Sequence, residues 1–203
     1  MNPETLIVRT GVANVASVVA AFRRLGVEPE FSSRPEDVAS AQALVLPGVG
    51  AFEAAMHALR AADLDAAIRD RVLAGRPTLC VCLGLQLLCE GSEEAPGVAG
   101  LAVIPHMVTR YPDSVRVPQL GWNRVEPEQG CRMLVSGYAY FANSYRLAEA
   151  PADWQVAWSD HGGRFVAAME RDGVLACQFH PELSGPWGLS LIGRWLESST
   201  RHA

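Results

Sequence analysis

The sequence predicts an α/β fold with a mostly parallel central sheet flanked by helices and a smaller antiparallel sheet beside it. In the first half of the chain, short apolar runs alternate with segments whose apolar residues recur at helical spacing, an order typical of parallel sheets. In the second half, short strands and turn residues follow one another closely, which favours antiparallel pairing. A length of 203 residues, 49% of them hydrophobic, suits a single domain spanning residues 1–203.

The first half alternates strands and helices up to about residue 88. The expected strands are residues 5–10, 27–31, 43–46 and 78–81. A helix is expected from Val15 to its end at Gly26, and helical stretches run from about Phe52 to Val72 before Gly75 and Pro77 end them. Residues 32–37 are polar and are expected to form a loop.

The second half begins with a turn-rich loop at residues 91–97. Short strands are then expected at residues 101–105, 115–118, 122–125, 139–145, 154–159, 165–170 and 174–179. Asp172-Gly173 is the clearest hairpin turn between two of them. The chain closes with a helix that carries Leu189, Ile192, Trp195 and Leu196 on one face.

Composition excludes several classes of function. The net charge is −5 and the 17 basic residues are scattered, which argues against nucleic acid as a partner. The sequence has no apolar run of about 20 residues and no signal-peptide pattern, so we expect no membrane association and a cytoplasmic location. The five cysteines lack the spacing of a disulfide framework or a zinc site, so we expect reduced thiols and no metal. We also expect no cofactor.

Residues 78–88 predict a buried strand that leads directly into a helix, with Cys82 at the corner. A thiol at this corner faces the positive end of the helix dipole, which favours the thiolate over the thiol. The Leu83 N–H is expected to point to the same place and Gly84 to let the turn pack closely, as in a nucleophile elbow. The alternative is that Cys82 is a small buried apolar residue, the usual role of a free cysteine.

Residues 47–52 follow the third expected strand and place Gly48 and Gly50 on either side of Val49. Two glycines at the carboxyl end of a central strand allow a backbone N–H to turn towards a ligand. No Gly-Lys-Ser/Thr follows, so the segment does not match a phosphate-binding loop. Taken alone, an ordinary connection between strand and helix is the simpler interpretation.

A histidine and a carboxylate, His180 and Glu182, stand at the end of the last predicted strand. A cysteine nucleophile needs a base, and the base needs a carboxylate to orient it. Because the carboxyl ends of parallel strands meet at one edge of the sheet, we expect both residues to lie near Cys82. Taken alone, His180 is a histidine at the edge of the core; paired with the predicted elbow, it indicates a Cys-His-Glu triad.

Taken together, these motifs resemble the class I glutamine amidotransferases, whose fold is flavodoxin-like. The resemblance is carried by Cys82-Leu-Gly-Leu-Gln86 and His180-Pro-Glu182. Further stretches resemble one subgroup, the glutaminase subunits of the imidazole glycerol phosphate synthases of histidine biosynthesis. These stretches are residues 10–14, 46–51, 92–94, 117–123, 140–141, 144–145 and 178–182.

The resemblance implies an enzyme that hydrolyses L-glutamine to glutamate and ammonia through a thioester. Cys82, His180 and Glu182 match the catalytic triad of the family, and Val49 and Leu83 match its oxyanion-hole positions. Glu94 suits the α-ammonium group of the substrate. The full set of positions that match the glutamine pocket of the family is Gly50, Gln86, Glu94, Ser144 and Tyr145.

The resemblance also implies a partner, a separate cyclase subunit with a (β/α)8 barrel, in a heterodimer. The cyclase receives the ammonia and makes imidazole glycerol phosphate and an aminoimidazole carboxamide ribotide. Partner and nucleotide are expected to favour the state in which the Val49 N–H faces the oxyanion. The positions expected at the interface are Asn14, Trp122, Tyr140, Asn143 and Leu183.

The sequence departs from the family pattern at four positions: Arg9, Cys80, Asn143 and Leu183, where the family usually has Asp, Gly, His, and Lys or Arg. Asn143 and Leu183 fall where the family meets its cyclase. A paralogous glutaminase subunit that feeds ammonia to another synthase is therefore an alternative. Two further alternatives are a Cys-His hydrolase unrelated to glutamine and a catalytically silent scaffold that only binds a cyclase.

Overall fold

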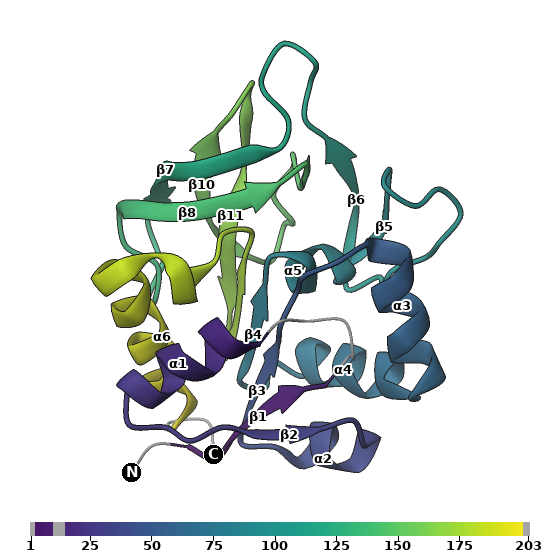
Figure 1. Cartoon of the computed structure of the whole chain (residues 1–203), viewed down its shortest axis with the longest axis vertical. Helices are drawn as coiled ribbons and strands as arrows, with labels where there is room; N and C mark the ends of the chain where they lie inside the picture. Colours follow the sequence, from purple (N-terminus) through teal and green to yellow (C-terminus); the bar gives the residue numbers. More distant parts are fainter. Residues whose placement is uncertain (1–2, 10–14, 201–203) are drawn as a thin grey trace.

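Within residues 3–9 and 15–200, which this computed structural model describes, nine strands form one continuous sheet (Figure 1). Its strand order is β2-β1-β3-β4-β12-β11-β10-β7-β8. The bounds are β1 Thr5–Val8, β2 Glu30–Ser32, β3 Ala43–Leu46, β4 Thr78–Val81, β7 Gln119–Pro127, β8 Gly137–Asn143, β10 Gln155–Asp160, β11 Arg164–Arg171 and β12 Val174–Cys177. The α/β fold class predicted from the sequence is confirmed.

The sheet changes from parallel to antiparallel at β12. From β2 to β12 neighbouring strands run parallel, and from β12 to β8 they run antiparallel. The predicted Asp172-Gly173 hairpin turn joins β11 to β12 and is confirmed. A separate three-stranded sheet contains β5 (Cys89–Ser92), β6 (Ile104–Arg110) and β9 (Tyr145–Arg146). It is mixed rather than antiparallel as expected, because β5 pairs with β6 in parallel.

Helices cover both faces of the parallel part of the sheet. In Figure 1, α1 (Ala16–Arg24) and α6 (Gly185–Ser199) lie on one side, and α3 (Phe52–Ala61) and α4 (Leu64–Leu73) lie on the other. Each layer has its own apolar core. Phe22 and Trp195 meet edge to face in the first core, and Phe52, Leu59 and Ile68 are fully buried in the second. The central strands β3, β4 and β12 are buried along their whole length, as a sheet covered on both faces requires.

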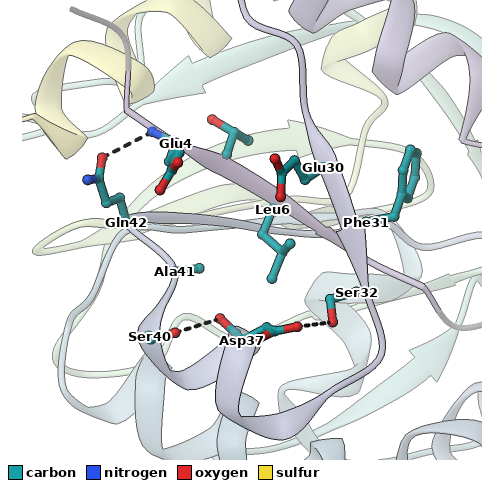
Figure 2. Close-up of a pocket in the computed structure, with 10 residues that line it drawn as sticks. Glu4, Leu6, Glu30, Phe31, Ser32, Asp37, Ser40, Ala41 and Gln42 are labelled. Carbon is teal, nitrogen blue, oxygen red and sulfur yellow. Dashed lines mark hydrogen bonds between the residues drawn. The ribbon is translucent and has the colours of Figure 1, made fainter.

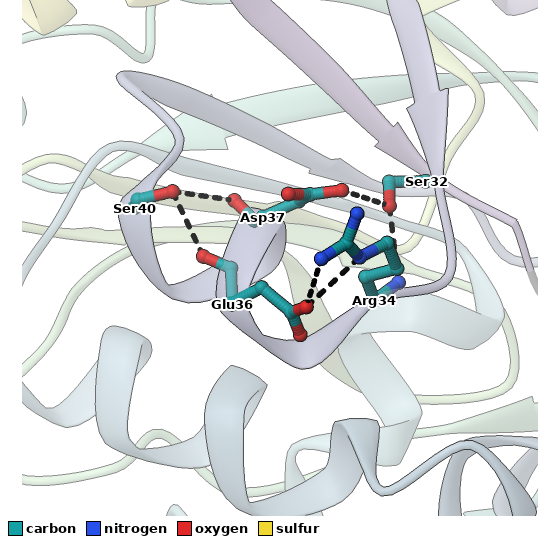
Figure 3. A network of polar contacts seen from close by, with 5 residues as sticks. All are labelled: Ser32, Arg34, Glu36, Asp37 and Ser40. Carbon is teal, nitrogen blue, oxygen red and sulfur yellow. Dashed lines mark hydrogen bonds and ion pairs between the residues drawn. The ribbon is translucent and has the colours of Figure 1, made fainter.

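Helix α2 (Pro35–Ser40) lies partly in the segment expected to be a loop. Pro35 opens the helix, and two acidic side chains, Glu36 and Asp37, occupy its first turn, where they complement the helix dipole. Figure 3 shows the polar contacts that fix this start: Ser32 donates to Asp37 at 2.6 Å, and Arg34 pairs with Glu36. The polar residues of segment 32–37, which suggested a loop, therefore form the beginning of a helix.

Several predicted strand bounds in the second half were wrong. Residues 115–118 are irregular, and the neighbouring strand begins at Gln119. Strand β6 begins at Ile104, close to the end of the strand expected at 101–105. The 3-10 helix η1 (Pro181–Leu183) then leads into α6, the expected C-terminal helix. Edges of short strands depend on pairing partners, which a local apolar pattern does not contain.

A buried arginine ties the amino ends of the central strands together. Arg71, on α4, is only 3% exposed and donates hydrogen bonds to the carbonyls of Val38, Gln42 and Pro77 and to the Thr78 hydroxyl. Burial lowers the pKa of Arg71 to about 10, assisted by the nearby charge of Arg76, so Arg71 is still charged at neutral pH. It therefore satisfies backbone carbonyls between α2 and the starts of β3 and β4.

We predict that Arg71→Met destabilises the fold by about 3 kcal/mol, because several buried oxygens lose their donors. Urea unfolding followed by circular dichroism measures the change. Arg69→Met is the matched control: this arginine lies on the same helix with a half-exposed side chain. Equal free energies of unfolding for the two variants would contradict the role assigned to Arg71.

Candidate functional site

The predicted site residues meet at the carboxyl ends of β3, β4 and β12, which are neighbours in the sheet. The loop after β3, the corner after β4 and the segment after β12 surround a cavity of about 410 Å³. Glu182 stands behind His180, outside this lining. The lining residues are Gly48, Val49, Gly50, Cys82, Leu83, Gln86, Glu94, Pro118, Ala142, Asn143, Ser144, Tyr145 and His180.

Cys82 occupies a strained corner between β4 and α5 (Leu83–Leu87). Its φ is +50° and its ψ is −106°, a region that non-glycine residues rarely adopt. Its own N–H donates to the Cys177 carbonyl of β12 at 2.7 Å, which holds the corner against the neighbouring strand. Strand, strained turn and helix in this order form the backbone of a nucleophile elbow.

Two glycines allow the loop after β3 to pack against this corner. A Cβ on Gly48 would collide with backbone atoms of Gly84 and Val81, and a Cβ on Gly84 would collide with the Leu46 carbonyl. Neither position therefore accepts a side chain without a shift of backbone. The close approach brings the 48–50 segment beside Cys82.

His180 lies opposite Cys82 and is oriented by Glu182. Its Nδ1 is 2.8 Å from Glu182 Oε1, and both side chains are 93% buried. The His180 N–H donates to the Tyr140 carbonyl at 2.9 Å, which attaches this segment to β8. Burial disfavours the imidazolium, but hydrogen bonds and charge interactions with Cys82 and Glu182 outweigh it and raise the pKa of His180 to about 10.

The Leu83 N–H donates to the Gly48 carbonyl at 3.4 Å. In a planar trans peptide the C=O and the following N–H point in opposite directions, so the Val49 N–H points away from Leu83. The two N–H groups expected to form an oxyanion hole therefore do not converge in this conformation. Convergence requires rotation of the peptide between Gly48 and Val49.

The remaining predicted pocket residues form the wall of the cavity. Glu94 Oε2 accepts a hydrogen bond from the Phe52 N–H, at the start of α3, at 3.2 Å. Gln86 Nε2 donates to the Tyr145 carbonyl at 3.1 Å. Gly50 and Ser144 complete the group that the cavity brings together.

Sequence reasoning assigned no separate role to Gln178, which the structure places against the thiol. Gln178 is fully buried, and its Nε2 lies 3.7 Å from Cys82 Sγ. An available signal was its spacing: in an extended segment, residues two apart face the same side, and Gln178 stands two before His180.

The expected interface residues differ in how far they are exposed to solvent. Trp122 and Leu183 are 59% and 44% exposed, and the Trp122 ring packs edge to face on Tyr140. Asn143 is only 6% exposed, and its Nδ2 donates to the Tyr111 hydroxyl and the Tyr145 carbonyl. Asn14 lies outside the described residues.

A second cavity, of about 380 Å³, lies towards the amino ends of β1 and β3 (Figure 2). Its charged lining is acidic, from Glu4, Glu30 and Asp37, and Asp37 is already bonded to Ser32. The lining contains neither a thiol nor an imidazole. The thiol and imidazole pair therefore lines only the first of these two cavities.

The part of the chain that the structure describes offers neither a cluster of metal ligands nor a membrane-spanning helix. In residues 3–9 and 15–200, no three His, Cys, Asp or Glu side chains are grouped so as to hold a metal ion. Over the same residues, no helix combines the length and apolar character needed to cross a membrane.

Comparison with known proteins identifies a family. The family model for glutamine amidotransferase class-I matches residues 6–196. The imidazole glycerol phosphate synthase subunit HisH of Methanothermobacter thermautotrophicus is 42% identical, over 94% of this chain and 96% of its own. The same subunit of Symbiobacterium thermophilum is 40% identical, over 94% of this chain and 92% of its own.

Solved structures agree on the fold. A glutamine amidotransferase crystal structure superposes with a TM-score of 0.76 at 23% identity, covering 96% of this chain and 98% of the other. The glutaminase domain of Trypanosoma brucei CTPS, with bound acivicin, gives a TM-score of 0.70 at 16% identity, covering 98% and 94% of the two chains.

We predict that His180 is protonated at neutral pH and loses its proton only as the pH rises through about 10. The hydrogen bond and the charge of Glu182 both raise this pKa, so Glu182→Gln should lower it. NMR titration of the imidazole carbon-bound protons measures both values. Glu126→Gln, at an exposed carboxylate on β7, is the control and should leave the titration unchanged. An unshifted His180 titration in Glu182→Gln would contradict the coupling.

Proposed function

The chain belongs to the class-I glutamine amidotransferase family, and from this premise we propose that it is the glutamine-hydrolysing subunit of an imidazole glycerol phosphate synthase in histidine biosynthesis. One observation carries the proposal. Cys82 stands on a strained elbow beside a histidine whose far nitrogen is held by a buried carboxylate, in a chain 42% identical to a HisH subunit.

In the proposed reaction, the resting pair is a Cys82 thiolate and a His180 imidazolium, in keeping with the raised pKa of His180. The sulfur attacks the side-chain carbonyl carbon of glutamine, and the carbonyl oxygen becomes an oxyanion. As this intermediate breaks down, the leaving amide nitrogen takes a proton from His180 and departs as ammonia, which leaves a thioester on Cys82. Water, activated by the now neutral His180, hydrolyses the thioester to glutamate. Glu182 keeps the imidazole oriented throughout.

The cavity provides groups suited to the two ends of the substrate. Glu94 offers a carboxylate for the α-ammonium group while it also caps α3 through the Phe52 N–H. Gln86 and the backbone of Ser144 and Tyr145 provide neutral polar groups along the wall. A volume of about 410 Å³ is sufficient for one free amino acid.

We place the control of the reaction in the peptide between Gly48 and Val49. In the observed conformation the carbonyl of this peptide accepts the hydrogen bond of the Leu83 N–H, and the Val49 N–H points away. An oxyanion would therefore meet neither of the two expected donors. Removal of a single such donor costs about 3 kcal/mol of transition-state stabilisation. Rotation of this peptide would free the Leu83 N–H and, in the same movement, turn the Val49 N–H towards the cavity. The absence of a side chain at Gly48, whose ψ angle changes in that rotation, lowers its barrier.

The proposed partner is a separate cyclase with a (β/α)8 barrel, which forms a heterodimer with this chain in the cytoplasm. Ammonia released into water at neutral pH becomes ammonium and is no longer a nucleophile, so the product needs a protected path to its acceptor. The proposed docking face is the outer side of the β7–β8 hairpin together with η1. It carries four exposed large apolar groups, Leu120, Trp122, Tyr138 and Leu183, beside the partly buried Tyr140.

The proposed docking face adjoins the segment that carries His180, the proposed base. A Cβ built on Gly185, just beyond η1, would lie 3.9 Å from the Trp122 ring. Tyr140, which pairs with Trp122 across the hairpin, accepts the His180 N–H. A partner seated on Trp122 and Tyr140 therefore lies directly beside the segment that carries His180.

We predict that Cys82→Ala lowers glutamine hydrolysis by at least about a thousandfold, because the nucleophile is lost. Glutamate release in the presence of the cyclase and its nucleotide substrate measures this loss. Synthesis with added ammonium should continue, since the cyclase chemistry does not use Cys82. Cys131→Ala, at a thiol outside the cavity, is the control. Glutamine hydrolysis by Cys82→Ala at the rate of the unmodified chain would contradict the proposal.

We predict that the cyclase and its nucleotide substrate accelerate glutamine hydrolysis. We also predict that Trp122→Ala weakens binding of the cyclase to this chain by about 2 kcal/mol, or roughly 30-fold. A titration of hydrolysis rate against cyclase concentration gives both quantities. Leu73→Ala, at an exposed leucine on α4 away from the hairpin, is the matched control. Equal rates with and without cyclase would refute the peptide switch, and an unchanged midpoint for Trp122→Ala would refute the docking face.

A further inference from the structure

Gln178 is a fully buried amide that lies beside the proposed nucleophile. It follows β12 directly, and its backbone N–H donates to the Ala167 carbonyl at 2.8 Å, which fixes its position in the sheet. His180 stands two residues further along the segment that leaves this strand. Both side chains therefore reach Cys82 from the same strand end, one with an imidazole and the other with a neutral amide.

The orientation of the Gln178 amide follows from its neighbours. The Tyr145 carbonyl only accepts hydrogen bonds, so the atom of Gln86 that faces it at 3.1 Å must be nitrogen. The same Gln86 nitrogen donates to Gln178 at 2.9 Å, so the Gln178 atom it meets must be oxygen. Gln178 Nε2 is then left on the other side, 3.7 Å from Cys82 Sγ.

We propose that Gln178, oriented by Gln86, is a hydrogen-bond donor that stabilises the thiolate form of Cys82 and holds its sulfur in place. A donor to a charged atom favours the charged form, and sulfur accepts at the longer distances seen here. This inference rests on the proposed role of Cys82 as nucleophile. It adds a neutral second donor to the sulfur, independent of His180.

Other groups also act on this sulfur. His180 acts directly, Glu182 acts through His180, and the Tyr111 hydroxyl is close enough for its ionisation to interact with that of Cys82. Tyr111 donates its proton to Gln119 at 2.7 Å and accepts one from Asn143, so its proton is committed elsewhere. Among these groups, Gln178 is the one that donates an N–H to the sulfur while its own side chain stays neutral at every pH.

The test is the pH dependence of alkylation of Cys82 by iodoacetamide, measured on the full chain without glutamine or partner. Mass spectrometry of the peptide that contains Cys82 separates its reaction from that of the other thiols. Gln178→Met removes the donor at similar volume and should raise the pH midpoint of alkylation by about one unit, with about tenfold slower reaction below the midpoint.

Two further variants sharpen the result. Gln178→Glu keeps an acceptor for Gln86 but replaces the donor with a carboxylate, so it should raise the midpoint further. Gln86→Met frees the Gln178 amide to rotate and should raise the midpoint by less than Gln178→Met. Gln42→Met, at an exposed amide near the amino end of β3, is the matched control and should leave the midpoint unchanged.

An unchanged midpoint in the folded Gln178 variants would overturn the inference, with folding verified by circular dichroism. If Gln178→Met does not fold, Gln178→Glu and Gln86→Met decide the question by the same criterion. The measurement uses no glutamine, so its failure is separate from a failure of the proposed function. A shifted midpoint in a chain that does not hydrolyse glutamine would retain the donor role and refute the function.

Discussion

The backbone turn at Cys82 is the constraint on which the rest of the site depends. Its positive φ directs the chain from β4 into α5 within one residue, so the thiol projects into the cavity instead of into the sheet. Such a conformation is unfavourable for a residue with a Cβ and needs support from its surroundings. The hydrogen bond to Cys177 and the close contact between Gly48 and Gly84 provide that support.

The same support leaves the proposed oxyanion hole unformed. Because Gly48 packs tightly on the elbow, its carbonyl is within reach of the Leu83 N–H and satisfies a donor that would otherwise be buried without a partner. This hydrogen bond stabilises the observed conformation of the loop. An oxyanion or a partner must replace it before the two N–H groups can converge. Under the proposed control, ammonia release would be slow while the partner is absent.

The sequence predicted the alternation of strands and helices in the first half, and the Cys82, His180 and Glu182 pattern, because those features follow from local spacing and from the rule that parallel strands end at one edge. Helix α2 was missed because its polar start resembled a loop. The bounds of β6 and β7 were misplaced because strand pairing is non-local. The contact between Gln178 and the thiol depends on side-chain rotamers that two elements distant in sequence, α5 and β9, impose together.

The change from parallel to antiparallel strands at β12 separates two tasks within one sheet. The parallel part supplies the elbow and the loop after β3, both buried between helices. The antiparallel part ends in the β7–β8 hairpin, whose outer face carries the proposed docking residues. His180 bridges the two parts, since it follows β12 while its N–H is bound by Tyr140 of β8. A displacement of the hairpin by a partner would therefore reach His180, the proposed base, directly, whereas the Cys82 thiol, held by β4 and β12, would stay in place.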